Sequence, residues 1–109
     1  QPDGAPHAVP VWYDVDGSHI AINTATHTVK YRNLQHNGRA VLTFVDPADT
    51  DRYLALHLLL VDTSDDDVGL QHLNALAQRY MGVREYPYRR AGDRHVRLRF
   101  SITRTSHLG

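Results

Sequence analysis

Cysteine is missing from the 109-residue chain, which excludes disulfide scaffolds, thiolate zinc sites, iron–sulfur ligation and cysteine nucleophiles. No apolar run approaches the roughly 20 residues of a membrane-spanning helix, and no signal peptide is visible. Net charge is missing too, because twelve basic residues balance twelve acidic ones. No bulk field therefore favours nucleic acid or an anionic membrane. We expect a cytoplasmic protein that binds neither.

Lysine is scarce as well, since eleven of the twelve basic residues are arginine and only Lys30 is lysine. The charges are unevenly distributed along the chain. Residues 1–51 carry three basic and six acidic side chains, and residues 52–83 carry two and four. Residues 84–109 carry seven arginines and two acids, a net charge of +5. The zero total is a cancellation between an acidic first part and a basic tail.

The length of the chain fits one domain, because domains usually contain about 100–150 residues. Hydrophobic residues make up 41% of it and charged residues 22%, which is ordinary for a globular protein and argues against disorder. We find no internal repeat, low-complexity tract or linker. Residues 1–109 are therefore taken as a single domain.

Alternating hydrophobicity predicts five strands, at residues 8–14, 18–24, 39–45, 53–63 and 95–103. The strand at 39–45 is apolar enough to be buried on both faces, and a polar loop follows it over residues 46–51. Asp16-Gly17 predicts a type I′ hairpin turn between the first two strands. With two short helices inserted, this order favours a mainly β α+β fold, a small and mostly antiparallel barrel or sandwich.

The two helices have recognisable ends. Asn37-Gly38 supplies a left-handed stop for a helix over residues 29–36. The second helix has Ser64 as its expected N-cap, acidic residues 65–67 in its first turn, and Gly82 at its end.

The segment before the first helix, residues 24–28, is rich in threonine. Such a loop brings hydroxyl groups, unpaired N–H groups and the positive end of the helix dipole to one place. Lys30 and Arg32 add two cations in the first turn, where the dipole disfavours them unless an anion is bound. A phosphate would remove this conflict. The alternative is that Thr26 or Thr28 is simply an N-cap and that both cations reach into solvent.

No pattern in the chain indicates a metal site or a catalytic nucleophile. The eight histidines show no i, i+4 pair and no adjacent carboxylate at ligand spacing. The acidic run at 65–67 is explained by a helix start. We expect no metal. The residues alone predict a pocket for an anionic, phosphorylated ligand, in an enzyme whose cofactor carries the chemistry.

The basic tail has two interpretations that the sequence leaves open. Arg97 and Arg99 share one face of the last strand, where they would meet a polyanion or solvent. Arginines also surround Tyr86 and Tyr88, an arrangement that suits a planar anionic ligand as well as a solvated loop.

Several short motifs occur in an order that covers nearly the whole chain. They are PVWYD at residues 10–14, DG at 16–17, NTA at 23–25, KYRNL at 30–34, VDP at 45–47, RYL at 52–54, RYMG at 79–82, YPY at 86–88 and VRL at 96–98. This order resembles the split-barrel flavin and deazaflavin oxidoreductases. These are the pyridoxamine 5'-phosphate oxidase-like proteins, and within them the chain resembles the branch predicted to use coenzyme F420.

The resemblance implies a homodimeric split barrel that holds two cofactors in grooves between its subunits. Lys30 matches the basic residue at the cofactor phosphate, with Arg32 and Asn33 beside it. The loop that approaches the phosphate is matched by Thr24, Ala25 and Thr26, and the strand that faces the ring is matched by Pro10, Val11 and Trp12. The implied reaction is hydride transfer between reduced F420 and a small unsaturated or carbonyl-containing substrate.

Two alternatives remain open at this point. A protein of the same fold would use FMN, and a non-catalytic one would bind F420, flavin or haem without turnover. The chain also departs from the family pattern. Thr28 and Val29 replace arginines that usually precede the lysine, and Leu58 and Leu59 replace a glycine and an arginine. From the resemblance we expect the family's N-terminal helix and first strand to be missing from this sequence, either because the chain was trimmed or because another segment fills their place.

Overall fold

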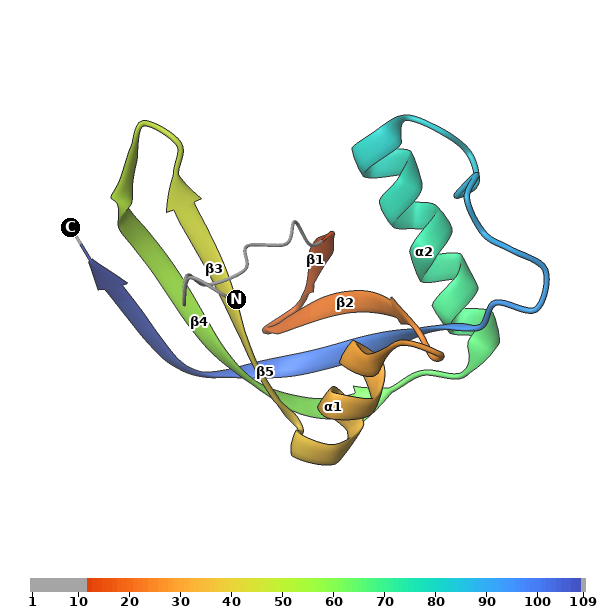
Figure 1. Cartoon of the computed structure of the whole chain (residues 1–109), viewed down its shortest axis with the longest axis horizontal. Coiled ribbons are helices and arrows are strands. Elements are labelled where there is room, and N and C mark those ends of the chain that lie inside the picture. Colours follow the sequence, from red (N-terminus) through yellow and green to blue (C-terminus); the bar gives the residue numbers. More distant parts are fainter. Residues whose placement is uncertain (1–11, 109) are drawn as a thin grey trace.

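The structure is a computed structural model that describes residues 12–108. It contains five strands and two helices (Figure 1). Their bounds are β1 Tyr13–Asp16, β2 His19–Ala25, α1 Val29–Asn37, β3 Arg39–Asp46, β4 Asp49–Thr63, α2 Asp66–Met81 and β5 His95–Leu108. Residues 8–11 of the first predicted strand lie outside the described residues.

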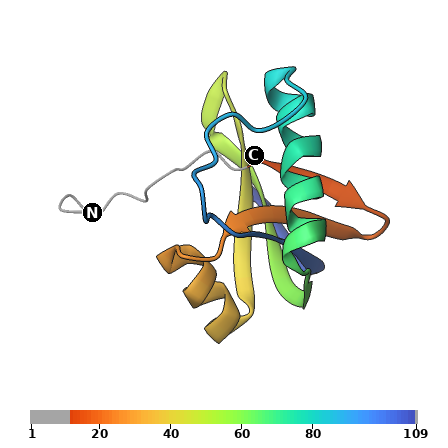
Figure 2. The same cartoon turned by 90° about the vertical axis from the view of Figure 1, so that its right-hand side faces the viewer.

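All five strands pair antiparallel in one sheet of order β1-β2-β5-β4-β3. The β3–β4 hairpin diverges from the β1–β2 hairpin, so the sheet curves but stays open (Figure 1). The two helices lie on opposite faces of the sheet (Figure 2). The mainly β α+β fold class, of the split-barrel kind, is confirmed. Within residues 12–108, no helix combines the length and apolar character needed to cross a membrane.

The hydrophobic core lies on the α1 face of the sheet. Alternate residues of β5, Val96, Leu98 and Phe100, are its centre and are at most 4% exposed. Ile102 continues the same alternation but is 42% exposed, because β2 ends where His19 pairs with Ser101. The remaining members of this core cluster come from β2, α1, β3 and β4: Ile20, Ile22, Leu34, Leu42, Leu56 and Leu58.

β3 is an edge strand, and the prediction that it is buried on both faces is wrong. Leu42 faces the core, whereas Val41 is 57% exposed and Val45 is 50% exposed on the other face. That face carries no covering layer here, because α2 packs against β5 and β2 instead. The apolar run in the sequence therefore reflects one core face and one uncovered apolar face.

Both tight turns differ from the predicted ones. Asp16 pairs with His19, so the first hairpin turns at Gly17-Ser18 rather than at Asp16-Gly17. Gly17 has φ of 62°, and no non-glycine residue in the described part of the chain has a positive φ. This pattern is typical of a type II′ turn, not type I′. The predicted loop over 46–51 is also mostly strand, because the β3–β4 hairpin needs only two residues, 47 and 48, to turn.

The N-cap of α2 is Asp65, not Ser64. The Asp65 carboxylate accepts a hydrogen bond from the Val68 N–H at 2.9 Å. Ser64 is held by β5 instead, since its N–H donates to the Arg97 carbonyl and its Oγ accepts from the Arg97 N–H. Tertiary pairing of Ser64 with β5 thus moves the helix start one residue along the chain.

Gly69 sets the distance between α2 and the sheet. A Cβ atom at this position would lie 1.9 Å from the carbonyl oxygen of His95 and 2.6 Å from the Cα of Val96. Both neighbours are backbone atoms of β5, so neither can rotate away. Only glycine allows the helix to lie this close.

We expect Gly69→Ala to lower the free energy of unfolding by about 2 kcal/mol, the usual cost of overpacking, although alanine is the better helix former by about 1 kcal/mol. Urea denaturation would measure the change. Gln71→Ala, on the exposed side of the same helix, should alter stability by less than about 0.5 kcal/mol. A Gly69→Ala protein as stable as the wild type would show that the backbone contact is not limiting.

Candidate functional site

Helix α1 begins at a threonine cap that is anchored to the end of β2. Thr28 Oγ1 accepts a hydrogen bond from the Tyr31 N–H at 3.1 Å and donates to the Ala25 carbonyl at 2.8 Å. Thr24 Oγ1 lies 3.4 Å from the same hydroxyl. The cap is thus Thr28 rather than Thr26, whose N–H is bonded to the Arg94 carbonyl at 2.8 Å.

The start of α1 carries positive charge without any acidic side chain. Its first turn contains no aspartate or glutamate, while it contains Lys30 and Arg32. A helix that begins at Val29 has no internal acceptors for its first N–H groups, and the Thr28 cap uses only that of Tyr31. The positive end of the helix dipole adds to these charges. The arrangement suits an anion supplied from outside the chain.

Helix α2 shows the opposite arrangement at its start. Asp65 caps it, and Asp66 and Asp67 occupy its first turn. Its dipole is therefore neutralised by its own sequence. Of the two helix starts, only that of α1 is left without an anion of its own.

The structure brings six of the nine predicted site residues to one corner of the fold. Thr24 and Ala25 end β2, Thr26 lies in the connecting turn, and Lys30, Arg32 and Asn33 follow on α1. Thr24 is buried, whereas Arg32 and Asn33 are exposed. Pro10 and Val11 lie outside the described residues. The corner is therefore built from the last residues of β2, the turn that follows it and the first turns of α1.

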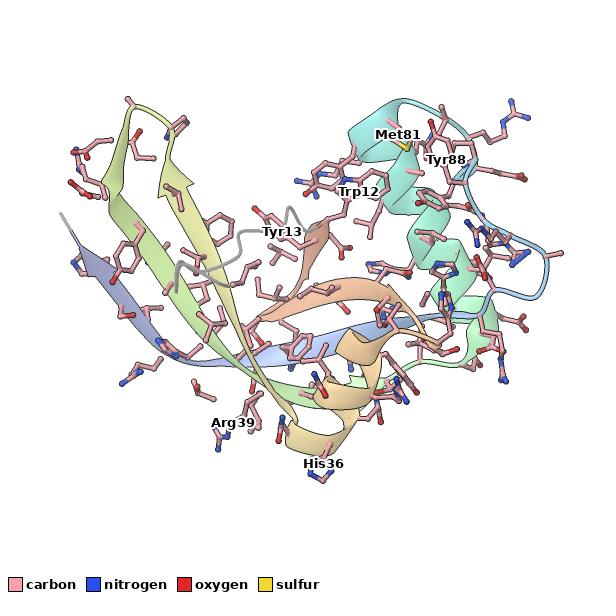
Figure 3. The ribbon with its side chains drawn as sticks, viewed as in Figure 1. Trp12, Tyr13, His36, Arg39, Met81 and Tyr88 are labelled. Atoms are coloured by element: carbon pink, nitrogen blue, oxygen red, sulfur yellow. The ribbon has the colours of Figure 1, made fainter. Side chains whose placement is uncertain are left out.

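Trp12 lies on the other face of the sheet. Its ring stacks on Tyr80 near the end of α2, with centroids 5.3 Å apart and planes within 4° (Figure 3). The Tyr80 hydroxyl donates to the Tyr13 carbonyl at 3.1 Å, and Tyr86 contacts the Trp12 ring edge-on. The structure does not bring the Trp12 side chain together with the threonine loop.

Two hollows flank α1. One, of about 370 Å³, lies between the starts of the two helices, and it includes Asp65 and the ion pair of Arg94 with Asp66 at 2.8 Å. The other, of about 400 Å³, lies between α1 and the edge of β3, with Asn33 and Arg39 among its polar residues and a mostly apolar lining. The first hollow reaches the start of α1 through Thr26 and Tyr31, and the second reaches the later part of this helix through Asn33 and Leu34.

One arginine of β5, Arg99, is neutralised by carboxylates within the chain. The Arg99 guanidinium donates to Asp62 on β4 and to Asp16 on β1. The Arg99 hydrogen bond holds the pKa of the Asp62 carboxyl below its ordinary value of 3.8. Burial lowers the pKa of His95, the first residue of this strand. Arg99 is therefore a structural cross-link between strands, and only Arg97 of the predicted pair makes no ion pair among the described residues.

Sequence reasoning missed a polar network under α2 that links Asp14, Asn23 and His72. These residues come from three separate elements, so no spacing rule connects them. The one local signal is His72 itself, a histidine three residues after Gly69 on the apolar side of a helix. Among the described residues, no group of three or more potential metal ligands occurs.

The comparisons with known proteins agree with this geometry. A model of the pyridoxamine 5'-phosphate oxidase family matches residues 1–106. The chain therefore belongs to the pyridoxamine 5'-phosphate oxidase family. No curated protein matches the chain.

Two solved structures are similar to this chain. A protein described as an F420 reductase is 31% identical, with a TM-score of 0.73 over 97% of this chain and 82% of that one. A conserved hypothetical protein from Mycobacterium tuberculosis is 22% identical, with a TM-score of 0.66 over 98% of this chain and 71% of that one. The second likeness concerns the fold alone. Together with the family match, the first points to an oxidoreductase that binds flavin or deazaflavin.

We expect Thr28→Val to destabilise the protein by about 1 kcal/mol, the usual value of an N-cap, because the Tyr31 N–H and the Ala25 carbonyl both lose their partner. Thermal unfolding followed by circular dichroism would measure the change. Thr26→Val is the matched control, since it keeps the backbone bond to Arg94. An equal loss of thermal stability in both variants would contradict the assignment of Thr28 as the cap.

Proposed function

We propose that this protein is an F420-dependent oxidoreductase that transfers a hydride between the reduced deazaflavin coenzyme and a small unsaturated or carbonyl-containing substrate. The observation that carries the proposal is the start of α1, which combines Lys30, Arg32 and a threonine cap with no acidic residue. The family supports an oxidoreductase of this fold. The similarity to a protein described as an F420 reductase favours the deazaflavin.

The residues at this corner fit a phosphorylated cofactor by their chemistry. In the proposal, Lys30 and Arg32 supply charge to the phosphate and Asn33 supplies an amide. Thr24, Ala25 and Thr26 form the wall of the site, and the first N–H groups of α1 donate to the phosphate oxygens. Where family members have arginine, Thr28 instead builds the cap that presents these N–H groups.

The coenzyme, when bound, would supply the hydride. The protein's part is to orient the two reactants and to exclude water from them. Pro10, Val11 and Trp12 are proposed to line the ring-binding side. Trp12 would contribute through the ring face that Tyr80 leaves uncovered.

The proposal includes a homodimer with the coenzyme between the subunits. An apolar strip on the outer face of β3 and β4, formed by Val41, Val45 and Tyr53, supports this part. Val45 and Tyr53 are direct neighbours in the strand register. Exposed apolar patches of this kind often mark association surfaces. Val41 also borders the hollow beside α1, together with Asn33 of the proposed site.

We expect Lys30→Ala to weaken F420 binding about tenfold or more, because one charge-assisted contact to a phosphate contributes roughly 1.5–3 kcal/mol. Quenching of coenzyme fluorescence during titration would measure Kd. Arg52→Ala, which removes an exposed cation near the start of β4, is the matched control and should leave Kd unchanged.

The same titration with FMN and with haem separates the alternatives. Tight binding of FMN with indifference to F420 would replace the coenzyme in the proposal. Binding of F420 without reduction of any carbonyl or enone substrate by reduced F420 would identify a carrier protein. A protein that binds none of F420, FMN and haem would overturn the enzyme proposal.

We expect the double change Val41→Lys and Val45→Lys to convert a dimer into a monomer and to weaken coenzyme binding with it. Sedimentation velocity at micromolar concentration would report the mass. Val15→Lys, at an exposed valine of β1, should leave the dimer intact. A wild-type protein that binds the coenzyme as a monomer would contradict the interface placement.

A further inference from the structure

Helix α2 crosses the β1–β2 hairpin (Figure 2). Three polar side chains form a continuous hydrogen-bonded row between these elements. His72 on α2 is only 8% exposed. Its Nε2 lies 2.8 Å from the Asp14 carboxylate, and its Nδ1 lies 3.1 Å from Asn23 Nδ2. The same Asn23 nitrogen donates to the Gly69 carbonyl at 2.8 Å. The row thus ties α2 to β1 at one end and to β2 at the other.

The position of every proton in this row follows from donor and acceptor chemistry. A backbone carbonyl only accepts, so the Asn23 atom that faces the Gly69 oxygen must be the amide nitrogen. That nitrogen only donates, so His72 Nδ1 accepts and carries no proton. The remaining ring proton of neutral His72 is then on Nε2, where it donates to Asp14.

Protonation of His72 is incompatible with this arrangement. A proton on Nδ1 would point at the Asn23 amide nitrogen, which cannot accept it. Rotating the amide by half a turn would present Oδ1 to the ring, but it would also place that oxygen against the Gly69 carbonyl. Asn23 can therefore serve either Gly69 or the imidazolium, but not both.

We propose that Asp14, His72 and Asn23 form a proton-sensitive latch between α2 and the sheet. With His72 neutral, Asn23 holds the Gly69 carbonyl and the latch is closed. With His72 protonated, the Asn23 amide turns to the ring, its bond to Gly69 breaks and the helix is released at this point. Asn23 Oδ1, which is buried without a hydrogen-bond partner, is the acceptor that the turned amide would offer.

The groups that face His72 bias the latch in both directions. Asp14 on β1 stabilises the imidazolium, since its carboxylate already accepts from Nε2. On the same side of the sheet, β5 contributes His95, Arg97 and Arg99, and Arg97 is the register partner of Asn23. Arg99 is already paired with Asp16 and Asp62. Arg97, which makes no ion pair among the described residues, disfavours a further cation, so the latch balances the Asp14 carboxylate against this charge.

The latch lies where α2 approaches the sheet most closely. Gly69 is where α2 makes its backbone contact with β5, and Asn23 directly precedes Thr24 on β2. Opening would therefore loosen the helix where it lies closest to the sheet. A further effect on the threonine loop at the cofactor rests on the proposed function, whereas the latch itself does not.

NMR of the cofactor-free protein with 15N-labelled histidine tests the latch directly. At about pH 8 we expect a His72 Nδ1 without a proton and a protonated Nε2, together with a protected Asn23 side-chain amide. As the pH falls towards 5, protonation of His72 should coincide with loss of that amide protection and with about tenfold faster amide exchange near Gly69. Any change at His57, which contacts Ser106 and Arg104 instead, should leave α2 unaffected.

Asn23→Asp provides the complementary variant, because a carboxylate accepts from Nδ1–H but cannot donate to Gly69. His72 should stay protonated to higher pH than in the wild type, and exchange near Gly69 should already be fast at pH 8. Asn37→Asp makes the same charge change at an exposed end of α1 and should leave both readouts unchanged.

Either of two wild-type results would overturn the latch, even if the Asn23→Asp protein does not fold. One is a proton on Nδ1 at pH 8. The other is protonation of His72 with no change at Asn23 or Gly69. A working latch with no F420 binding would leave the latch standing and remove only the proposed function.

Discussion

The backbone contact of Gly69 with His95 is the constraint on which much of the fold depends. It fixes α2 at a distance from β5 that no side chain larger than hydrogen permits. At that distance the Gly69 carbonyl comes within 2.8 Å of Asn23 on β2, and His72, one turn further along, is buried against Asp14. Towards the end of the helix, Tyr80 meets Trp12 and Tyr13. One helix therefore holds β1, β2 and β5 together on the face opposite the core.

The two helices differ in the chemistry of their starts. Asp65 and its acidic neighbours neutralise the dipole of α2, so that helix is free to act as a covering layer. The start of α1 has no such anion and gathers Lys30 and Arg32 instead. Cations at a helix N-terminus cost stability of about 0.3–1 kcal/mol each at an exposed site. A protein tolerates such a cost most readily where a bound anion removes it.

The sequence predicted the elements well and their ends less well, for physical reasons that differ from case to case. Alternation located the strands because the core has one clear face, as Leu98 and Phe100 show. It overestimated the burial of β3, since an apolar run does not reveal whether a second layer covers Val41. The choice between Thr26 and Thr28 as the cap depended on a tertiary bond from Thr26 to Arg94. In the same way, pairing with β5 removed Ser64 from its predicted role.

The same distinction between local and tertiary information applies to the polar groups described above. The threonine loop and the start of α1 are continuous in sequence, so local chemistry and family resemblance both identified them. The Asp14–His72–Asn23 row joins residues up to 58 positions apart, and only the fold reveals it.

The fold also brings together some of the opposite charges that sum to zero in the sequence. Arg94 and Arg99 from the basic tail pair with Asp66, Asp62 and Asp16 from the acidic part, so part of the cancellation takes the form of ion pairs within the chain. Arg32, in the first turns of α1, forms no ion pair among the described residues, which is consistent with the proposed anionic ligand.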